Sequence, residues 1–465
     1  MQDLSGRVPG VHFEGDRGLS SRGRGETEQQ RGGAASGSAI FHFGFPRREA
    51  YLRAVARVLL LLPTKSYRTS DFLAAARSLK LDVTVASEEP SALEKSRPDG
   101  LLTLDFRDPA ACARRAVEYA RRYPVAAVLG VDEQTAVAAA AIAAALDLPA
   151  NPSSAAVAAW HKPTLRRRLK AAGVPTPNHA VFARGEDPEA ISRRLRYPCV
   201  LKPTFLSGSR GVIRANTPAE FLAAWSRIAR LLEQPDVARI GGKLSREILV
   251  EDFAPGREFA LEGLLREGAL SVLALFDKPD PLDGPFFEET IYVTPSRLGA
   301  SEQERIREVV ADGARALGLV EGPVHAEVRH GESGTWLIEL AARSIGGLCA
   351  RTLRFGTGVS LEELILSNAL RLPIPSLERE RLAAGVMMIP IPRPGVLREV
   401  HGLDRARAVP GLVEATISAH PGQTLVPLPE GSRYLGFLFS RAETPERAEA
   451  ALREAHAALE FRIEG

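Results

Sequence analysis

Between residues 50 and 150, short apolar runs alternate with amphipathic stretches. The apolar runs lie at 56–63, 82–86, 101–105 and 125–130, and helical patterns lie around 72–79, at 110–122 and at 134–146. Alternating strands and helices of this kind predict a parallel sheet with helices on both of its faces. The turn after the first strand, PTKSYRTSDF, lacks a GxGxxG motif, which argues against a dinucleotide site there.

The pattern changes after residue 150. A helical stretch at 151–173 ends at a break in the chain marked by Pro175 and Pro177. Strands are predicted at 247–251, 258–265, 269–276, 287–294, 321–329 and 335–341. Many strands with few helices favour an antiparallel sheet. Capping boxes, in which Ser or Thr precedes Glu by three residues, predict helix starts at 217–220, 301–304 and 360–363.

The two ends of the chain differ from each other. Residues 373–465 begin at a linker with Pro373 and Pro375, and they mix short strands with a terminal helix capped by Thr444 and Pro445. Residues 1–49 are rich in Gly, Ser, Arg, Gln and Glu, which predicts a disordered tail. We therefore expect a tail at 1–49, an α/β domain at 50–150, a mixed domain at 151–372 and a small α+β lobe at 373–465.

Composition narrows the class of protein. A chain of 465 residues with 45% hydrophobic and 25% charged residues is typical of a globular protein with about three domains. A net charge of +3 gives no reason to expect nucleic acid as a partner. The longest apolar runs fall short of the ~20 residues that a membrane span needs. Three widely spaced cysteines without a CxxC motif argue against disulfides or structural zinc, and predict a cytoplasmic protein.

Lysine is scarce, since only eight of the 60 basic residues are lysines. One of them, Lys202, ends an apolar strand and precedes a loop of small residues, SGSRG at 207–211. Such a loop lets successive backbone N–H groups converge on an anion, and a nearby lysine adds positive charge. The alternative is an ordinary turn. The sequence lacks a GxxxxGK[ST] motif, so the loop is not of the Walker A type.

Carboxylates stand out in two further stretches. Glu251 and Glu258 flank a Pro-Gly break, and the alternative there is a hairpin with solvated acids. Glu327 and Glu339 lie on two strands of a predicted hairpin, with Arg343 four residues after the second. A carboxylate within an apolar run is unfavourable unless it is paired or bound to a metal. Two carboxylates that face each other across a hairpin therefore indicate a divalent cation between them, and Mg²⁺ suits carboxylates and phosphates.

Taken in order, these stretches resemble the ATP-grasp superfamily. HKPTLRRRLKAAGVPTP at 161–177 is followed by VLKPTFLSGSRGVIRA at 200–215, VEDFAPGREFALEG at 250–263 and IELAARSIGG at 338–347. The resemblance covers about 150–370, and the chain looks most like carboxylate–amine ligases of the L-amino acid ligase type. The segment PGLVEATISAHPG near the C-terminus adds to this. The resemblance implies an ATP-grasp fold with an N-terminal parallel α/β domain and a small C-terminal α+β lobe.

The resemblance also implies which residues hold ATP: Lys162, Lys202, Ser207, Gly208, Ser209, Gly211, Glu251, Phe253 and Glu258. The two lysines would contact the phosphates, and the small-residue loop would close over them. The chain at 251–253 would hold the edge of the adenine, and Glu258 would bind the ribose hydroxyls.

Metal binding and catalysis follow from the same resemblance. Glu327 and Glu339 would ligate Mg²⁺ or Mn²⁺, and Arg343 would face the reacting acyl phosphate. Many members carry an asparagine ligand two residues after the second glutamate, whereas this chain has Ala341. This departure bears on a two-metal arrangement and not on the nucleotide site.

The implied reaction has two steps and small-molecule substrates. A carboxylate attacks the γ-phosphate of ATP to give an acyl phosphate and ADP, and an amine then displaces phosphate to leave an amide or peptide bond. Dimers are common among such enzymes, so a homodimer is compatible with the resemblance.

Two alternative functions remain. An ATP-dependent carboxylase would share the whole nucleotide site, although an AMKM-like biotinyl segment is missing from the sequence. A non-catalytic ATP-binding protein is disfavoured by the complete set of lysines, glutamates and Arg343.

Several other residues have two interpretations each. Lys278 lies in a loop rich in Pro, Asp and Gly, and it lines either the acceptor side of the site or the surface. His325 either faces substrate or is a core histidine. Phe253 and Trp336 are expected to serve packing, and the basic run 166–168 to form a solvated helix face. The remaining lysines are expected at the surface: Lys65, Lys80, Lys95, Lys170 and Lys243.

Overall fold

The computed structural model describes residues 56–465, and the tail predicted at 1–49 lies outside them. The first domain is a four-stranded parallel sheet in the order β3-β2-β1-β4. Its strands are β1 (Arg57–Leu61), β2 (Asp82–Ser87), β3 (Leu101–Thr103) and β4 (Ala127–Gly130). Its helices are α2 (Thr69–Ser78), α3 (Pro109–Ala120) and α4 (Glu133–Ala145).

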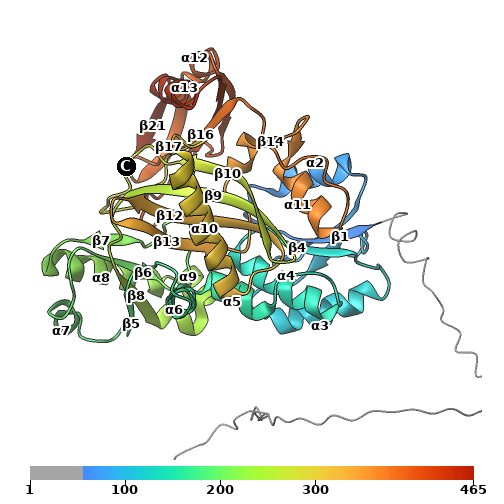
Figure 1. Ribbon diagram of the computed structural model, residues 1–465, viewed down its shortest axis with the longest axis horizontal. Helices are drawn as coiled ribbons and strands as arrows, with labels where there is room; N and C mark the ends of the chain where they lie inside the picture. Colours follow the sequence, from blue (N-terminus) through green and yellow to red (C-terminus); the bar gives the residue numbers. More distant parts are fainter. Residues whose placement is uncertain (1–55) are drawn as a thin grey trace, which may run out of the picture. The chain divides into compact units, whose positions relative to one another are not determined.

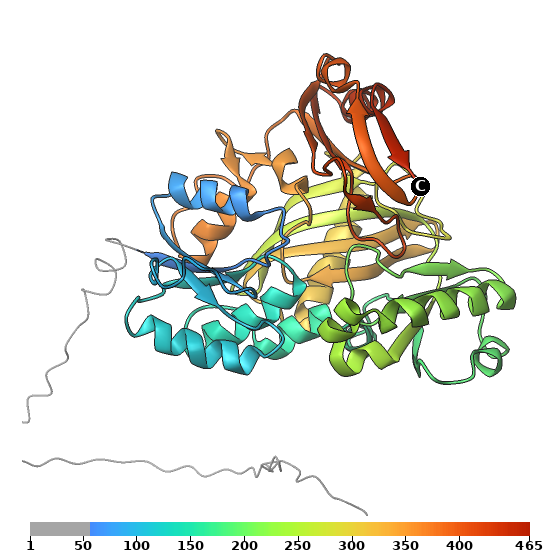
Figure 2. The same cartoon turned by 180° about the vertical axis from the view of Figure 1, so that it is seen from behind.

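Alternation along β1 explains why helices cover both faces of this sheet. Leu59 and Leu61 point to the side where α3 and α4 pack, whereas Val58 and Leu60 point to the side where Phe72 of α2 packs. Figure 2 shows α2 in blue on one side of the sheet and α3 in cyan on the other. The predicted parallel sheet with helices on both faces is confirmed.

A smaller antiparallel sheet follows the joint formed by α5 (Ser153–Trp160) and α6 (Lys162–Ala171). Its order is β5-β8-β6-β7, with β5 (His179–Ala183), β6 (Cys199–Pro203), β7 (Ile213–Ala215) and β8 (Glu247–Asp252). The helices of this region are α7 (Pro188–Ser192), α8 (Pro218–Glu233) and α9 (Pro235–Gly241), and a 3₁₀ turn covers Gly242–Arg246. The apolar stripe of α8, including Phe221 and Trp225, packs on Leu201 of β6.

The third sheet has eight strands in the order β13-β12-β9-β10-β11-β16-β20-β18, and its pairs are antiparallel. The first five in this order are β13 (Gly334–Ala341), β12 (Gly322–Gly331), β9 (Arg257–Arg266), β10 (Ala269–Asp277) and β11 (Ile291–Thr294). The others are β16 (Ala383–Ile389), β20 (Gly436–Ala442) and β18 (Leu412–Ile417). The antiparallel sheet predicted for this part of the chain is confirmed. Pairing of β11 with β16 joins the two segments on either side of residue 372.

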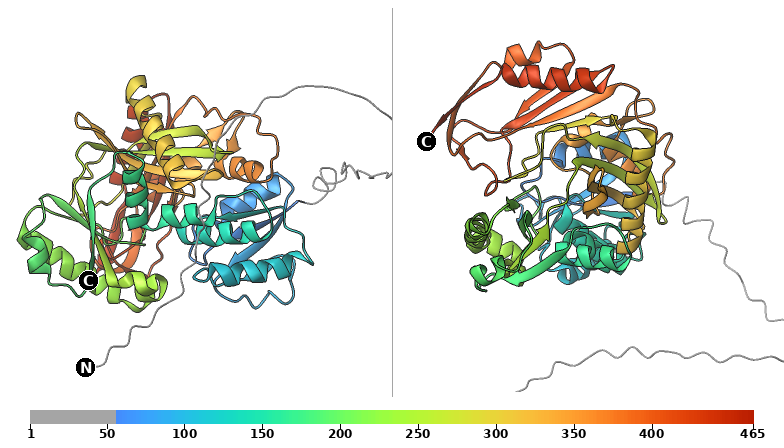
Figure 3. Two further views of the ribbon diagram at one scale, coloured as in Figure 1. Left: turned by 60° about the horizontal axis from the view of Figure 1, so that its bottom comes forward. Right: turned by 60° about the vertical axis from the view of Figure 1, so that its left-hand side comes forward.

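Helices cover this large sheet at both ends. Helix α10 (Ala300–Leu317) lies across β9, β12 and β13 in Figure 1, where Ile306 and Val310 pack on the strands. Helix α13 (Pro445–Ala457) covers β16 and β20, as Figure 3 shows in red, and buries Ala448 and Leu452. The remaining elements are η2 (Cys349–Thr352), β14 (Arg354–Phe355), β15 (Val359–Ser360), α11 (Leu361–Ala369), β17 (Gly395–His401), α12 (Leu403–Arg407), β19 (Thr424–Leu425) and β21 (Glu460–Glu464).

The capping predictions have mixed outcomes. Ser360 and Glu363 form the expected reciprocal box, and the Thr217 side chain accepts a hydrogen bond from the expected amide. The box predicted at 301–304 is wrong, because α10 begins at Ala300. Glu302 accepts a hydrogen bond from the Gly299 N–H at 2.9 Å, which satisfies that amide and starts the helix earlier. Within residues 56–465, the helices lack the length and apolar character that crossing a membrane requires.

Candidate active site

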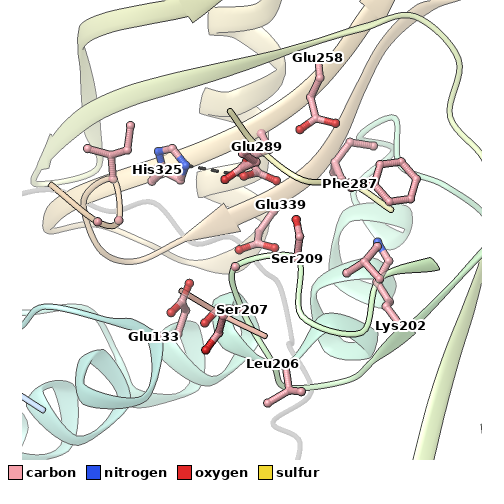
Figure 4. Close-up of a pocket in the computed structure, with 18 of the residues that line it drawn as sticks. Glu133, Lys202, Leu206, Ser207, Ser209, Glu258, Phe287, Glu289, His325 and Glu339 are labelled. Carbon is pink, nitrogen blue, oxygen red and sulfur yellow. Dashed lines mark ion pairs between the residues drawn. The ribbon is translucent and has the colours of Figure 1, made fainter. Parts of the chain in front are cut away.

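One cavity of about 290 Å³ lies where the three sheets approach one another. Its walls include eleven of the twelve residues predicted for the site: Lys162, Lys202, Ser207, Gly208, Ser209, Glu251, Phe253, Glu258, Glu327, Glu339 and Arg343. Figure 4 shows Glu258, Glu289 and Glu339 on one side of this cavity, and Lys202 and Ser207 on the other. Sequence motifs that lie up to 181 residues apart, from Lys162 to Arg343, are therefore gathered around one space.

Lys202 is held at the end of β6 by a buried carboxylate. Its Nζ lies 2.7 Å from Oε2 of Glu251 on the neighbouring strand β8, and both side chains are buried. Arg166 of α6 contacts the same carboxylate, with its Nε 2.7 Å from Oε1. Burial opposes ionisation of Glu251, but the charges of Arg166 and Lys202 outweigh it and hold its pKa at about 2.

The prediction of a solvated face at 166–168 is wrong for Arg166, whose residue is 1% exposed. Helix α6 turns Leu165, Arg166 and Leu169 inward together, so the guanidinium extends into the protein and also donates to the Ile338 carbonyl at 2.6 Å. Arg166 lies at the edge of the stripe formed by Leu165 and Leu169, and its sequence surroundings alone do not mark it as buried. The five lysines expected at the surface are exposed.

Lys278 is the centre of a second buried cluster. Its Nζ lies 2.7 Å from Glu258 and 3.3 Å from Glu327, and it also contacts Glu289. With 5% exposure, Lys278 is not a surface residue. Burial opposes its charge, but the three carboxylates raise its pKa well above the ordinary value. The alternative of a hairpin with solvated acids at 251–258 is wrong too, because β8 and β9 belong to different sheets, Glu251 is buried, and the Glu258 side chain is only 9% exposed and paired with Lys278.

Glu289 was missed by sequence reasoning. Its carboxylate contacts Lys278 and receives a hydrogen bond from the Tyr292 hydroxyl at 2.7 Å. One of its oxygens lies within 4.8 Å of an oxygen of Glu258 and of an oxygen of Glu327. Burial raises its pKa to about 7, against the opposing effect of Lys278. The available signal was the acidic pair in FFEET, next to the Pro- and Gly-rich loop.

The two glutamates of the hairpin face each other, as predicted. Glu327 of β12 and Glu339 of β13 are register partners, and Nζ of Lys162 lies 3.3 Å from Glu339. Arg343 lies 3.9 Å from Glu339, and its Nε donates to Oε1 of Glu133 at 2.9 Å. Glu133 is the second residue missed. It begins α4 after the carboxyl end of β4, which is the edge of a parallel sheet where ligands bind.

Phe253 and His325 both line the cavity, and each lies next to charged side chains. Phe253 lies between two guanidinium groups, those of Arg214 at 4.0 Å and Arg329 at 4.8 Å from its ring centre. His325 is 3% exposed, with Nδ1 3.1 Å from Glu262, and it also lines the cavity. His325 therefore combines both interpretations, a buried histidine that reaches the site.

The small-residue loop at 207–211 turns sharply beside Lys202. Gly208 and Ser209 have φ of +63° and +56°, successive left-handed conformations that a loop of small residues adopts in a tight turn. Ser207, Gly208 and Ser209 line the cavity, whereas Gly211 lies behind them and donates its N–H to the Pro429 carbonyl at 2.8 Å.

The donors around the cavity suit a divalent cation with phosphate groups. Glu327 and Glu339 offer hard oxygen ligands, Lys162 adds positive charge beside Glu339, and Lys202 adds it on the other side of the cavity. Ala341 is fully buried and offers no side-chain ligand. Glu327 and Glu339, whose side chains are each 20% exposed, thus fit Mg²⁺ with two protein ligands, completed by phosphate oxygens and water.

Comparison with known proteins gives two family matches. Residues 195–352 match the ATP-grasp domain, and residues 387–464 match the L-amino acid ligase C-terminal domain 2. Among solved structures, an L-amino acid ligase from Bacillus licheniformis is similar, with 26% identity, a TM-score of 0.75, and coverage of 88% of this chain and 99% of that one.

Curated relatives point the same way. The protein y4rH of Sinorhizobium fredii, which is uncharacterised, is 24% identical over 88% of this chain and 83% of its own length. A D-alanine–D-alanine ligase of Aromatoleum aromaticum is 28% identical over 38% of this chain, which spans 58% of that ligase. An alanine–anticapsin ligase of Bacillus subtilis is 26% identical over 46% of this chain and 47% of its own length.

Proposed function

We propose that this chain, which belongs to the ATP-grasp superfamily and carries an L-amino acid ligase C-terminal domain, is a C–N bond-forming ligase that activates a carboxylate with ATP and joins it to an amine. The observation that carries the proposal is the arrangement of Glu327 and Glu339 as facing partners, with Lys162, Lys202 and Arg343 around the same cavity. Carboxylates for a metal and cations for phosphates are the two requirements of phosphoryl transfer.

In this proposal, the nucleotide lies between the small sheet and the large one. Lys162 and Lys202 bind phosphate oxygens, and backbone N–H groups of 207–209 approach the same phosphates. The carboxylate of Glu251 is fully engaged by Arg166 and Lys202, so the adenine edge meets the backbone of 251–253 and not this side chain. Glu258 is paired with Lys278 and is proposed to bind the ribose hydroxyls from there.

Glu327 and Glu339 are the proposed metal ligands. Bound Mg²⁺ would neutralise charge on the β- and γ-phosphates. In the first step, an oxygen of the substrate carboxylate attacks the γ-phosphorus and ADP leaves. In the second, the amine nitrogen attacks the acyl carbon, loses a proton, and phosphate departs with the carboxylate oxygen.

Arg343 is the proposed catalytic residue. Glu133 fixes its guanidinium in the cavity, where it stabilises negative charge on the acyl phosphate and on the intermediate formed by amine attack. Because an acyl phosphate reacts with water, the loop at 207–211 must also cover the site during the reaction.

The test is a screen of the full chain for ADP and phosphate release with Mg·ATP over pairs of amino acids, with products identified by mass. We expect ADP and amide product in equal amounts, only when an acid and an amine are both present, and loss of both products when the metal is chelated. ADP formation that requires bicarbonate in place of the pair would favour a carboxylase. Binding of ATP without ADP release for any pair would favour a non-catalytic nucleotide-binding protein.

A further inference from the structure

The C-terminal domain contacts the small-residue loop at its Arg210–Gly211 end, away from the residues of the loop that line the cavity. Residues 427–434, between β19 and β20, reach the loop in two places. The Gly211 N–H donates to the Pro429 carbonyl at 2.8 Å, and Nε of Arg210 donates to the Glu430 carbonyl at 2.8 Å. We call residues 427–434 the clasp segment.

A side-chain ion pair anchors the clasp segment to the small sheet's own helix. Glu430 accepts two hydrogen bonds from Arg227 of α8, one of them at 2.8 Å from Nη2 to Oε2. The guanidinium of Arg227 also lies 4.9 Å from the ring centre of Phe286, in the Pro-rich loop of the large sheet. Arg227 therefore joins the small sheet to both the clasp segment and the large sheet.

These contacts fix one end of the small-residue loop. A Cβ on Gly211 would lie 2.8 Å from both Pro203 and Leu231, so this residue is pressed against the small sheet on one side and bonded to the clasp segment on the other. With its Gly211 end fixed, the loop presents Ser207, Gly208 and Ser209 to the cavity. Ser432 and Tyr434 of the clasp segment line that same cavity.

We propose that Glu430 and Arg227 are positioning residues that hold the phosphate loop closed, so that the C-terminal domain controls how long the loop covers the cavity. Neither side chain lines the cavity, so both act through Arg210 and Gly211. The contacts themselves do not depend on the proposed function, whereas their effect on catalysis rests on it.

Trypsin cleavage after Arg210 tests the contacts without reference to activity. The Arg210 guanidinium donates to the Glu430 backbone carbonyl at 2.8 Å and to Gln234 at 3.0 Å and lies 3.6 Å from Asp236, so it must leave these partners before a protease can bind it. Glu430→Ala keeps the carbonyl and removes the side chain whose ion pair with Arg227 holds it in place. In the full chain, Glu430→Ala is expected to speed formation of the fragment that begins at Gly211 by about fivefold to tenfold. Arg227→Ala should do the same, and the double variant should add little, because both changes break one ion pair.

Glu443→Ala is the matched control, since Glu443 forms an exposed ion pair with Arg447 on α13 in the same domain. It should leave cleavage at Arg210 unchanged. Equal cleavage rates in the wild type and Glu430→Ala, or additive effects of the two substitutions, would overturn the proposal. Thermal unfolding of each variant shows whether faster cleavage reflects global unfolding, and Arg227→Ala replaces Glu430→Ala if the latter does not fold.

Steady-state kinetics of the ligase reaction then tests whether these contacts affect catalysis. For Glu430→Ala, we expect KM for ATP to rise about fivefold with little change in kcat, and ADP to exceed amide product because water reaches the acyl phosphate. Unchanged KM and an unchanged ratio of ADP to amide would contradict the catalytic part. If no ligase activity is found, the cleavage assay still decides whether the clasp segment holds the loop.

Discussion

Replacing Lys202 with methionine is expected to lower kcat/KM of the ligase reaction by about 10²–10³, the range found when one hydrogen-bond donor to a developing anion is removed. Lys202 is buried beside the small-residue loop. Burial lowers the pKa of its ammonium group, and the negative charge of Glu251 opposes this effect. Methionine conserves most of the volume and removes only the ammonium group. Steady-state kinetics with ATP and the substrate pair found in the screen provide the measurement.

Two observations separate this effect from a general loss of structure. Lys170→Met changes an exposed lysine of α6 and should leave kcat/KM within twofold of the wild type. Because Arg166 still pairs with Glu251 in Lys202→Met, the variant is expected to stay folded at assay temperature. A folded Lys202→Met enzyme with wild-type activity would contradict the assignment of this lysine to the phosphates.

The largest expected effect on stability comes from Arg166→Met. This substitution removes the hydrogen bonds of Arg166 to Glu251 and to the Ile338 carbonyl. Because Lys202 remains as a partner of Glu251, we expect a loss near the lower end of the about 3–5 kcal/mol that removing one member of a buried ion pair costs. Urea denaturation, followed by fluorescence, measures the free energy of unfolding. Arg167→Met is the control, because Arg167 is exposed and, among residues 56–465, donates only to the Thr164 hydroxyl, and its effect should stay within about 0.5 kcal/mol.

The pH dependence of this difference has a predicted sign. The folded-state pKa of Glu251 is about 2, below the ordinary value of 4.5. A depressed carboxyl pKa contributes stability above the unfolded pKa, and this contribution is lost as the pH falls towards 2. The difference between the wild type and Arg166→Met should therefore be full at pH 5 and above and shrink on acidification. A difference that is constant from pH 5 to pH 3 would contradict the role of this ion pair.

The sequence revealed those site residues that lie in local motifs. Lys202, Glu327 and Glu339 lie in strands with a recognisable pattern and Arg343 follows one of them, and their order along the chain indicated a shared site. That Glu327 and Glu339 face each other was predictable, because the short turn of a hairpin brings its two strands side by side.

The residues that were missed depend on contacts between distant parts of the chain. Glu133 meets Arg343 across 210 residues, and Arg166 meets Glu251 across 85. Neither pair carries a pattern of its own, because each residue alone looks like an ordinary charge at a helix start or on a helix face. The contact of Glu430 with Arg227 also leaves no local pattern in the sequence, because the pairing of β16 with β20 decides where the clasp segment lies.

The proposed acyl phosphate is tested most directly by finding which bond breaks in the second step. A substrate acid labelled with ¹⁸O in its carboxylate is incubated with the full chain, Mg·ATP and the amine, and the released phosphate is analysed by mass. Formation of an acyl phosphate transfers one carboxylate oxygen to phosphorus, so we predict one ¹⁸O atom in each phosphate formed with the amide. Amide formation with unlabelled phosphate, or with AMP and pyrophosphate in place of ADP, would contradict it.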